Sequence, residues 1–466
     1  MNQKVEITRR EALTAAGAAS AVAAVGAVAA RSRERNAVRP VRAASQQVRY
    51  GLIGTGDRGS FLLNRLKEVD NGRCAALCDI YPPNLARALK IMDGVPKAYT
   101  DYREVLADKN IDAVLIATPL YRHFPITRDA LEAGKHVFCE KCLVFTAREV
   151  HALRALAAAH SKQVLQTGLQ RRYSPFYQAA KAMIGKGIIG DVTHIRAQWH
   201  RNGSGRRPVS DRALDRQINW RFYREYSGGL TAELASHQID VADWFFGAMP
   251  EFVAGVGGID YWRDGRDTYD NILLHFQYPK GRKLMYSSIS TNAYLPLFGG
   301  TRPQFGEEIL GTGGTIQITI GDAANPAVGP AIALWYREPN APKVQAAGKA
   351  KENWVAGATS AASGGGTRAL PLLLPADAIG NRDGFLQREV KYARHWLYAK
   401  GIAVPEEPRN PVTLSLEDFF RCAMDGRRPA ADVEAGLADS VGVILSNLAM
   451  DEGRRVQYRE IEGMGQ

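Results

Sequence analysis

Cysteine is scarce in this chain of 466 residues, which has five: Cys74, Cys78, Cys139, Cys142 and Cys422. An odd, widely spaced set is not typical of a disulfide framework, so a packed core must hold the fold together. Cys74 and Cys78 lie on one expected strand, about 13 Å apart, which is too far for a bridge. Cys139 and Cys142 form an isolated C-x-x-C at a strand end, for which packing is favoured over a redox or zinc role.

Nucleic-acid-binding motifs and internal repeats are also missing from the chain. The formal net charge is +12, but the basic residues are scattered, apart from a short cluster at residues 31–35. DNA and RNA are therefore not expected partners. A basic surface of this kind suits an anionic cofactor or an acidic small molecule equally well. Hydrophobic residues make up 45% of the chain, which is enough to form a sizeable core.

The first residues have the pattern of an export signal. Residues 8–13 read TRREAL, a twin-arginine sequence, and an uncharged Ala/Gly-rich stretch follows from 13 to 30. We therefore predict a Tat signal peptide and linker over residues 1–45, and a periplasmic or other extracytoplasmic location. No stable membrane span is expected after processing. A membrane anchor or a disordered tail is the alternative interpretation.

Strands and helices alternate from residue 46 to residue 168. Strands are expected at 48–53, 73–78, 112–117, 136–140 and 163–168, with helices at 58–69, 82–92, 123–134 and 146–160. This alternation predicts an α/β fold with a doubly wound parallel sheet, the Rossmann class of dinucleotide-binding domain. The segment DAVLIA at 112–117 is continuously apolar, as expected for a strand buried on both faces.

The pattern changes after residue 168. A helix is expected at 175–184 and another at 229–246, with strands at 192–200, 252–261, 271–278, 283–291, 308–311 and 315–320. Consecutive strands without helices between them predict a mainly antiparallel sheet. Residues 169–338 are therefore expected to form a second α/β domain.

The remaining sequence divides into an insertion and a helical tail. Residues 339–384 are rich in Ala, Gly, Ser and Pro and are expected to be irregular. Helices are expected again over 385–466, packing back on the body. Thr413 and Ser415 are candidate N-caps for one of them, and Asp418 completes a capping-box pattern from Ser415.

The first expected strand runs into GTGDRG, which fits G-x-G-x-x-G and opens a helix. Gly54 allows the tight turn, Gly56 lets backbone approach a pyrophosphate, and Gly59 lets helix and strand pack closely. The N–H groups at the helix start supply hydrogen bonds and a partial positive charge for the phosphates. The residues assigned to the cofactor here are Gly54, Thr55, Gly56, Asp57, Arg58 and Gly59.

Asp79 lies twenty residues after Gly59, at the end of the second expected strand. A carboxylate at this place accepts hydrogen bonds from the ribose hydroxyls of adenosine and repels a 2′-phosphate. The sequence therefore predicts NAD as the cofactor, with NADP less favoured.

Further candidates follow the neighbouring strands at their carboxyl ends, the edge where doubly wound sheets bind ligands. Lys141, beside a nicotinamide ring, would stabilise the alkoxide that forms as a hydroxyl loses its hydride and proton. A solvated lysine at a strand end is the alternative. The residues assigned to the cofactor from this edge are Ala117, Thr118, Pro119, His123, Glu140, Lys141 and Gln170.

The helix at 229–246 carries Glu233, His237 and Asp240 at spacings that put all three on one face of an α-helix. Imidazole exchanges protons near neutral pH, and a carboxylate one turn away can orient it and raise its basicity. We take Lys141, His237 and Glu233 as the catalytic residues; a hydrogen-bonded structural histidine is the alternative. No third metal ligand stands out nearby, so no metal is expected.

Two segments rich in aromatic and arginine residues accompany this helix, GLQRRY at 168–173 and NWRFY at 219–223. They combine aromatic faces with amide and guanidinium donors, the chemistry that binds a sugar ring. Core aromatics with surface arginines are the alternative. The predicted substrate-binding residues are Lys141, Arg171, Tyr173, Trp220, Arg221, Glu233, His237 and Asp240.

With these motifs together, the chain resembles the Gfo/Idh/MocA family, which includes glucose–fructose oxidoreductase and inositol dehydrogenase. The resemblance rests on GLIGTGDRG, CDIY, DAVLIATP, KHVFCEK, GLQRR, GGLTAELASHQIDVADW and the tail ADVEAGLADSVGVILSNLAMDEGRRV. It covers about residues 48–336 and 414–456. It implies a Rossmann domain followed by an α/β domain whose large open antiparallel sheet often forms an oligomer interface, so a dimer or tetramer is expected. Twin-arginine signals also occur in this family.

The resemblance extends to the candidate catalytic residues. Lys141 matches the lysine of the family's Glu-Lys-Pro motif. Glu233 and His237 match its acidic residue and histidine, which act on the substrate hydroxyl. The chain departs from the family pattern at Cys142, where a proline would restrict the backbone.

The leading hypothesis is an exported NAD-dependent oxidoreductase that moves a hydride between nicotinamide and a ring carbon of a sugar, cyclitol or related polyol. Because free NAD is scarce outside the cytoplasm, the cofactor is expected to stay bound and to be recycled. One alternative is an NAD-dependent glycoside hydrolase or lyase that oxidises the sugar only transiently. Another is a non-catalytic sugar- or dinucleotide-binding protein.

Overall fold

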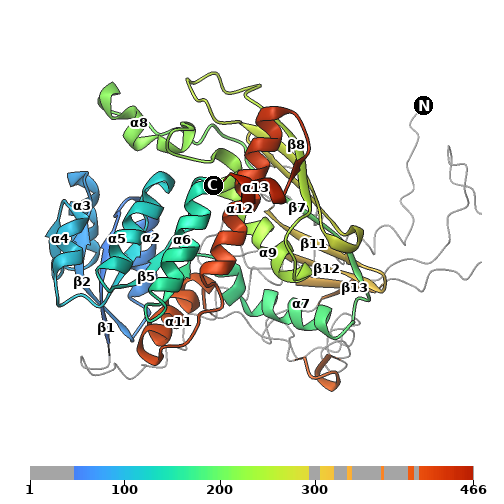
Figure 1. Cartoon of the computed structure of the whole chain (residues 1–466), viewed down its shortest axis with the longest axis horizontal. Helices are drawn as coiled ribbons and strands as arrows, with labels where there is room; N and C mark the ends of the chain where they lie inside the picture. Colours follow the sequence, from blue (N-terminus) through green and yellow to red (C-terminus); the bar gives the residue numbers. More distant parts are fainter. Residues whose placement is uncertain are drawn as a thin grey trace, which may run out of the picture. The chain divides into compact units, whose positions relative to one another are not determined.

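The computed structural model describes residues 47–292, 305–319, 333–337, 369–371, 397–402 and 409–464 (Figure 1). These residues fall into two compact units. The larger unit holds residues 47–178, 197–292, 305–306 and 409–464, and therefore every candidate site residue. The export signal at 1–45, most of the insertion at 339–384 and the start of the tail at 385–396 lie outside the described residues.

A six-stranded parallel sheet has the strand order β3-β2-β1-β4-β5-β6. Its strands are β1 Val48–Ile53, β2 Gly72–Cys78, β3 Lys97–Tyr99, β4 Ala113–Ile116, β5 His136–Cys139 and β6 Leu165–Thr167. The connecting helices are α2 Asp57–Leu66, α3 Pro82–Ile91, α4 Tyr102–Ala107, α5 His123–Glu132 and α6 Ala147–Ala159. The predicted Rossmann sheet is confirmed, and the apolar strand β4 is buried at all of its residues.

The sequence pattern does not predict β3 or α4. Three residues in β3 are too few to show a period of two. Helix α4 has only six residues, and its N-cap is Asp101, whose side chain accepts a hydrogen bond from the backbone N–H of Arg103 at 2.9 Å. Elements this short depend on contacts with the neighbouring sheet and helices more than on their own sequence.

The second sheet has nine strands in the order β14-β13-β12-β11-β7-β10-β9-β8-β15. They are β7 Val192–His200, β8 Phe252–Gly258, β9 Asn271–Gln277, β10 Lys283–Ile289, β11 Phe305–Gly311, β12 Gly314–Thr319, β13 Ala333–Arg337, β14 Ala369–Pro371 and β15 Val456–Gln457. Antiparallel pairing joins β8 to β9 and β15, β9 to β10, and β13 to β12 and β14. The mainly antiparallel sheet is therefore confirmed, although β13, β14 and β15 are not predicted from the sequence.

The helix expected at 229–246 is present but is not a regular α-helix throughout. A π-helical turn, η7, spans Thr231–Ala235, and α9 spans Ser236–Phe246. All residues of α9 except Trp244 are buried. The polar residues of α9 must therefore find partners within the protein. A π turn also changes the angular offset between Glu233 and His237 that an ideal α-helix would give.

Two helices, α11 Pro411–Asp425 and α12 Val433–Glu452, lie near the end of the chain. The capping prediction for the first is wrong. Its N-cap is Asn410, whose Oδ1 accepts a hydrogen bond from the N–H of Val412 at 2.9 Å, and Pro411 occupies the first helical position. Thr413 and Ser415 lie inside the helix and are buried.

Helix α11 packs on the parallel sheet through aromatic side chains. Phe420 stacks on Tyr50 of β1 with ring centres 5.3 Å apart, and Phe419 meets Phe138 of β5 edge-on at 5.8 Å. A Cβ on Gly72 would lie 2.3 Å from the Phe420 ring, so this contact requires glycine at the start of β2. The core of the larger unit therefore joins its first and last segments.

Helix α12 packs against α9 and β8 in the same unit (Figure 1). Among the described helices it alone is long and apolar enough to cross a membrane, with a mean hydropathy of 1.3. However, 67% of that stretch is buried within the protein, which is typical of a core helix. The remaining described helices are α7 Pro175–Gly185, α8 Asp215–Ile218 and α13 Arg459–Gly463, with 3₁₀ turns at Leu120–Arg122, Gln170–Tyr173, Arg212–Leu214, Trp220–Phe222 and Pro279–Gly281.

Candidate active site

The glycine-rich turn between β1 and α2 has the geometry that a bound diphosphate requires. Gly54 has φ 89°, and a Cβ there would lie 2.7 Å from the carbonyl group of Ala117. A Cβ on Gly59 would lie 2.0 Å from the carbonyl oxygen of Gly54. A Cβ on Gly56 would meet its nearest atom, Nδ2 of Asn84, only at 3.7 Å, so there is free space beside the turn at this residue. Helix α2 begins without a side-chain cap, which leaves its first N–H groups for an anionic ligand.

Asp79, at the end of β2, holds this turn in place. Its Oδ2 accepts hydrogen bonds from the backbone N–H of Thr55 at 2.7 Å and from the Thr55 hydroxyl at 3.0 Å. Its Oδ1 accepts from the N–H of Tyr81 at 2.8 Å. The carboxylate is thus fixed beside the phosphate turn and is only partly buried, as a ribose ligand would require.

Arg58 and Glu140 form an ion pair, with Nε and Oε1 2.7 Å apart. Glu140 is only 5% exposed, and a Cβ on Gly168 would lie 2.8 Å from its other carboxyl oxygen. The pair connects the first turn of α2 to the end of β5. Each of these two predicted cofactor residues therefore holds the other in place at the edge of the site.

His123 is buried between the loops that follow β4 and β5. Its Nδ1 lies 2.6 Å from the carbonyl oxygen of Cys142, and its Nε2 lies 2.9 Å from that of Thr118. Both ring nitrogens are therefore occupied by backbone groups. In contrast, the Thr118 hydroxyl and the Gln170 carbonyl oxygen are buried without a hydrogen-bond partner among the described residues. A bound cofactor would satisfy such groups.

Lys141 extends from the end of β5 to the π turn. Its Nζ donates hydrogen bonds to the carbonyl oxygens of Ala232 at 2.7 Å and Glu233 at 3.0 Å. A π turn departs from the regular α-helical hydrogen-bond pattern, and the Lys141 ammonium group binds two carbonyl oxygens of this irregular turn. Because an ammonium has three N–H bonds, one remains for a substrate oxygen. The peptide bond between Lys141 and Cys142 is cis.

Glu233 pairs with Arg221, whose Nε donates to Oε2 at 2.7 Å. Burial by itself raises the pKa of Glu233, but the positive charges of Arg221 and Lys141 outweigh it, and the pKa lies below its ordinary value. Glu233 is therefore ionised at neutral pH. The helical spacing predicts that Glu233 orients His237, but in the structure this carboxylate pairs with Arg221.

His237 is 7% exposed and stacks on Trp199, with ring centres 5.8 Å apart and the ring planes inclined by 26°. Burial and the nearby charges of Lys141 and Arg171 hold the pKa of His237 well below its ordinary value. Among the described residues, no group forms a hydrogen bond with its ring. His237 is therefore a neutral imidazole at physiological pH, the protonation state that a general base needs.

Two further predicted substrate residues have partners inside the protein. Asp240 is 1% exposed and accepts a hydrogen bond from Nε of Arg172 at 2.8 Å. Burial raises the pKa of Asp240, against the opposing effect of Arg172. Arg171 is 1% exposed, and its guanidinium lies 5.7 Å from the ring centre of Tyr177. Both residues support the site from within the core.

Tyr173 and Trp220 differ in their surroundings. Tyr173 is buried, and its hydroxyl accepts a hydrogen bond from the N–H of Ala431 at 3.3 Å. Trp220 is only half-buried, and the guanidinium of Arg221 lies 4.3 Å from its ring centre. Trp220 therefore fixes the arginine that holds Glu233, whereas Tyr173 belongs to the core.

Three further residues lie at the candidate site and are not predicted from the sequence. Trp199 and Arg201 lie at the end of β7, where Trp199 stacks on His237 and the charge of Arg201 contributes to the lowered pKa of Glu233. Asp439 of α12 is fully buried near Asp240, and burial raises its pKa well above the ordinary value. Asp439 is flanked by the apolar residues Leu437, Val441 and Val443, and a carboxylate within an apolar stretch of a helix is a signal that the sequence does contain.

The cysteine pair lies beside this site. Cys139 and Cys142 are buried free thiols, and burial raises the pKa of both. Such thiols are poor nucleophiles and poor metal ligands. In the part of the chain that the structure describes, no group of three or more His, Cys, Asp or Glu side chains has an arrangement suited to a metal ion.

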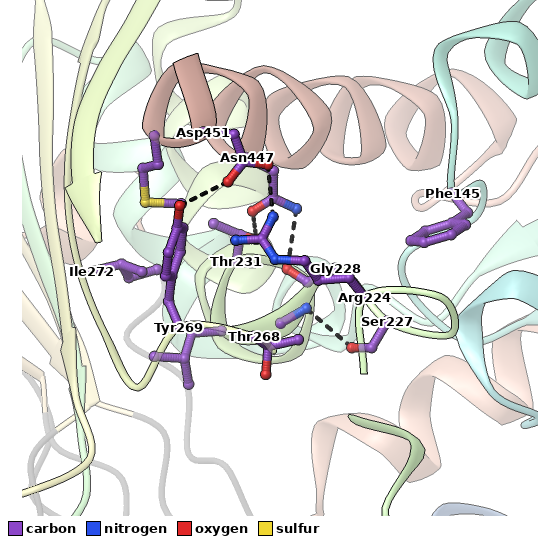
Figure 2. Close-up of a pocket in the computed structure, with 13 residues that line it drawn as sticks. Phe145, Arg224, Ser227, Gly228, Thr231, Thr268, Tyr269, Ile272, Asn447 and Asp451 are labelled. Carbon is purple, nitrogen blue, oxygen red and sulfur yellow. Dashed lines mark hydrogen bonds and ion pairs between the residues drawn. The ribbon is translucent and has the colours of Figure 1, made fainter. Parts of the chain in front are cut away.

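A cavity of about 180 Å³ lies behind the π turn (Figure 2). On one side of it, Asn447 of α12 accepts a hydrogen bond from the Thr231 hydroxyl at 2.6 Å and donates one to the carbonyl oxygen of Gly228 at 3.1 Å. One turn further along α12, Asp451 pairs with Arg224 at 2.7 Å. Lys141, Glu233 and His237 do not line this cavity. Its contacts instead anchor the turn that carries Glu233.

Two regions match models of one protein family. Residues 48–168 match the model described as "Oxidoreductase family, NAD-binding Rossmann fold" and residues 177–317 match the "GFO/IDH/MocA C-terminal domain". Together the two matches cover more than half of the chain.

Three curated relatives are each similar over less than half of the chain. An uncharacterized oxidoreductase of Synechocystis sp. is 30% identical over 214 residues, 46% of this chain and 55% of the relative. A myo-inositol 2-dehydrogenase of Thermotoga maritima is 30% identical over 212 residues, 46% of this chain and 59% of the relative. An inositol 2-dehydrogenase/D-chiro-inositol 3-dehydrogenase of Lactiplantibacillus plantarum is 29% identical over 203 residues, 43% and 53% of the two chains. The chain thus spans little more than half the length of these relatives.

Solved structures show the same fold. An aldose-aldose oxidoreductase from Caulobacter crescentus, complexed with glycerol, aligns with a TM-score of 0.62 at 20% identity, over 88% of this chain and 99% of that one. A scyllo-inositol dehydrogenase from Lactobacillus casei, with bound NAD(H) and scyllo-inositol, aligns with a TM-score of 0.60 at 20% identity and the same coverage.

Proposed function

The chain belongs to the Gfo/Idh/MocA family of oxidoreductases, and on this basis we propose that it transfers a hydride between NAD and a ring carbon of a sugar, cyclitol or related polyol. One observation carries the proposal. The ammonium group of Lys141 donates a hydrogen bond to the carbonyl oxygen of Glu233 in the π turn, one turn before the neutral imidazole of His237. The names of the similar proteins, inositol dehydrogenases and an aldose-aldose oxidoreductase, support the substrate class.

The cofactor assignment follows from the phosphate turn. The first N–H groups of α2 would hold the diphosphate, and the carboxylate of Asp79 would hold the adenosine ribose. The unpartnered oxygens of Thr118 and Gln170 are available to the rest of the dinucleotide. When bound, the nicotinamide ring supplies the hydride acceptor or donor.

The protein's own groups handle the proton and the charge. His237, kept neutral by burial, takes the proton of the substrate hydroxyl. The free N–H of Lys141 donates a hydrogen bond to that oxygen as negative charge develops on it. Glu233, kept ionised by Arg221, accepts a hydrogen bond from a neighbouring hydroxyl and so orients the ring.

Three further properties are part of the proposal. The twin-arginine sequence at 8–13 supports export by the Tat pathway to the periplasm. Scarcity of free NAD there favours a cofactor that stays bound and is recycled on a second substrate. An apolar pair on the second sheet supports a homo-oligomer, because Val256 and Leu273 face each other across β8 and β9 and are 65% and 47% exposed.

Mass spectrometry of products tests this function. The purified full chain is incubated with NAD and a panel of inositols, aldoses and glycosides. We expect a product lighter by two hydrogens, or a pair of oxidised and reduced sugars. A released aglycone with an unchanged sugar would instead establish an NAD-dependent glycosidase. Bound NAD without any reaction would favour a non-catalytic binding protein.

A further inference from the structure

A basic loop that follows β7 contacts the phosphate turn. The loop follows β7, and the Nη2 atom of Arg207 lies 2.5 Å from Oδ2 of Asp57. Asp57 is the first residue of α2, directly after the glycine turn. The loop therefore touches the helix end at which the dinucleotide diphosphate is expected.

The backbone of Arg207 is held firmly. Its N–H donates to Oδ1 of Asn219 at 2.9 Å, and its carbonyl oxygen accepts from Nδ2 of the same residue at 3.0 Å. Asn219 is 2% exposed. The preceding residue, Arg206, donates to the Tyr223 hydroxyl at 2.8 Å and pairs with Asp215. The backbone from which the Arg207 side chain extends toward Asp57 is therefore fixed by a partly buried network.

The surroundings of Asp57 carry an excess of positive charge. Arg87 of α3 also pairs with this carboxylate, at 3.4 Å, and its Nε donates to the Ser60 hydroxyl at 3.1 Å. Two guanidinium groups thus share one carboxylate beside the uncapped start of α2. The Asp57 side chain is 57% exposed, and an exposed ion pair contributes little to stability. The arrangement leaves a net positive charge for an anionic ligand.

We propose that Arg207 is a cofactor-retaining residue, which binds the dinucleotide diphosphate and fastens the loop after β7 over it. This inference rests on the proposed binding of NAD and deepens it, because it assigns the slow release of the cofactor to a named residue. Arg207 presents a planar guanidinium whose paired N–H groups match two phosphate oxygens. The contact to Asp57 holds the side chain ready at the turn.

The test compares Arg207→Ala with Arg212→Ala in the full chain. Arg212 opens the 3₁₀ turn that follows the same loop and is exposed, and its guanidinium forms no hydrogen bond or ion pair within the described residues, so the control removes the same charge. NADH release is followed by the loss of its fluorescence after mixing with excess NAD. Cofactor copurifying with each protein is measured by mass spectrometry. We expect NADH release to be about 10-fold or more faster in Arg207→Ala, because this variant loses one charge-assisted hydrogen bond to the cofactor. Arg212→Ala should change the release rate little.

Each outcome decides one point. Unchanged release in Arg207→Ala, or equal acceleration in both variants, would overturn the role of Arg207 while leaving NAD binding intact. A wild-type protein that binds no NADH would overturn the proposed function and this role with it. Arg207→Lys, which keeps the charge but not the planar fork, should show intermediate release, and it serves in place of the alanine variant if that variant does not fold.

Discussion

Lys141 shows how one residue can join two parts of a site. Its ammonium sits on the carbonyl oxygens of Ala232 and Glu233, so it fixes the π turn and still keeps a donor for substrate. Hydrophobic replacement would leave those two carbonyl groups without this partner and remove a positive charge near Glu233 and His237. The same residue would therefore affect both the proposed reaction and the electrostatics of its neighbours.

We expect Lys141→Met to lower kcat/KM about 10²- to 10³-fold, the usual effect of removing one donor to a developing oxyanion. NADH affinity should fall much less than kcat/KM, because the phosphate turn and Asp79 supply most of the proposed cofactor contacts. Steady-state kinetics on the substrate found by mass spectrometry, together with fluorescence titration of NADH, measure both. Lys162→Met, at an exposed lysine before β6, is the matched control and should keep full activity. Equal activity in both variants would contradict the assignment of Lys141.

At the scale of elements, a local signal sets the start of helix α11. Helix α11 begins at Asn410 and Pro411, a combination that satisfies one free N–H and presets the first helical φ. Ser and Thr at the positions chosen from the sequence are inside the helix, because the proline places the start earlier. The capping-box pattern from Ser415 is therefore coincidental.

Replacement of the N-cap gives a direct prediction. Asn410→Ala should lower the free energy of unfolding by about 1 kcal/mol, because the N–H of Val412 loses its side-chain acceptor. Urea unfolding followed by circular dichroism measures the change. Asn410→Ser retains an acceptor oxygen and should recover most of the loss. If both variants unfold at the same urea concentration as the wild type, the cap does not contribute.

The π turn at Thr231–Ala235 illustrates what sequence periodicity misses. The spacing of Glu233, His237 and Asp240 predicts one shared face of an α-helix. In the structure, Glu233 belongs to the π turn and pairs with Arg221, while Asp240 pairs with Arg172 inside the core. The helix itself is predictable, but the partner of each carboxylate depends on loops far away in sequence.

At the scale of the whole molecule, several buried histidines link stability to pH. His200 of β7 is 1% exposed, with Nε2 2.8 Å from the Ser287 hydroxyl, and burial lowers its pKa to about 4. The unfolded chain, with an ordinary pKa near 6.5, binds the proton more tightly. The contribution of His200 to stability is therefore complete above about pH 6.5 and is lost as the pH falls toward 4.

We expect His200→Gln, which retains a donor for Ser287, to flatten this dependence. Between pH 7 and pH 5 the wild type should lose about 2 kcal/mol more unfolding free energy than the variant. Other titrating groups are common to both proteins, so they cancel in the comparison. Urea unfolding at a series of pH values gives the two curves. Parallel curves would show that His200 does not titrate in this range.

The sequence alone determined the parts that depend on local patterns. Alternating strands and helices, the turn from Gly54 to Gly59 and the position of Asp79 follow from periodicity and backbone requirements, which act over a few residues. The tertiary structure decided which side chains meet. Burial placed Arg171 and Asp240 among core partners, occupied both nitrogens of His123 with carbonyl groups, and brought Arg207 to Asp57. The physical reason is that partners separated by many residues are selected by packing and by the need to pair buried polar groups, neither of which leaves a periodic trace in the sequence.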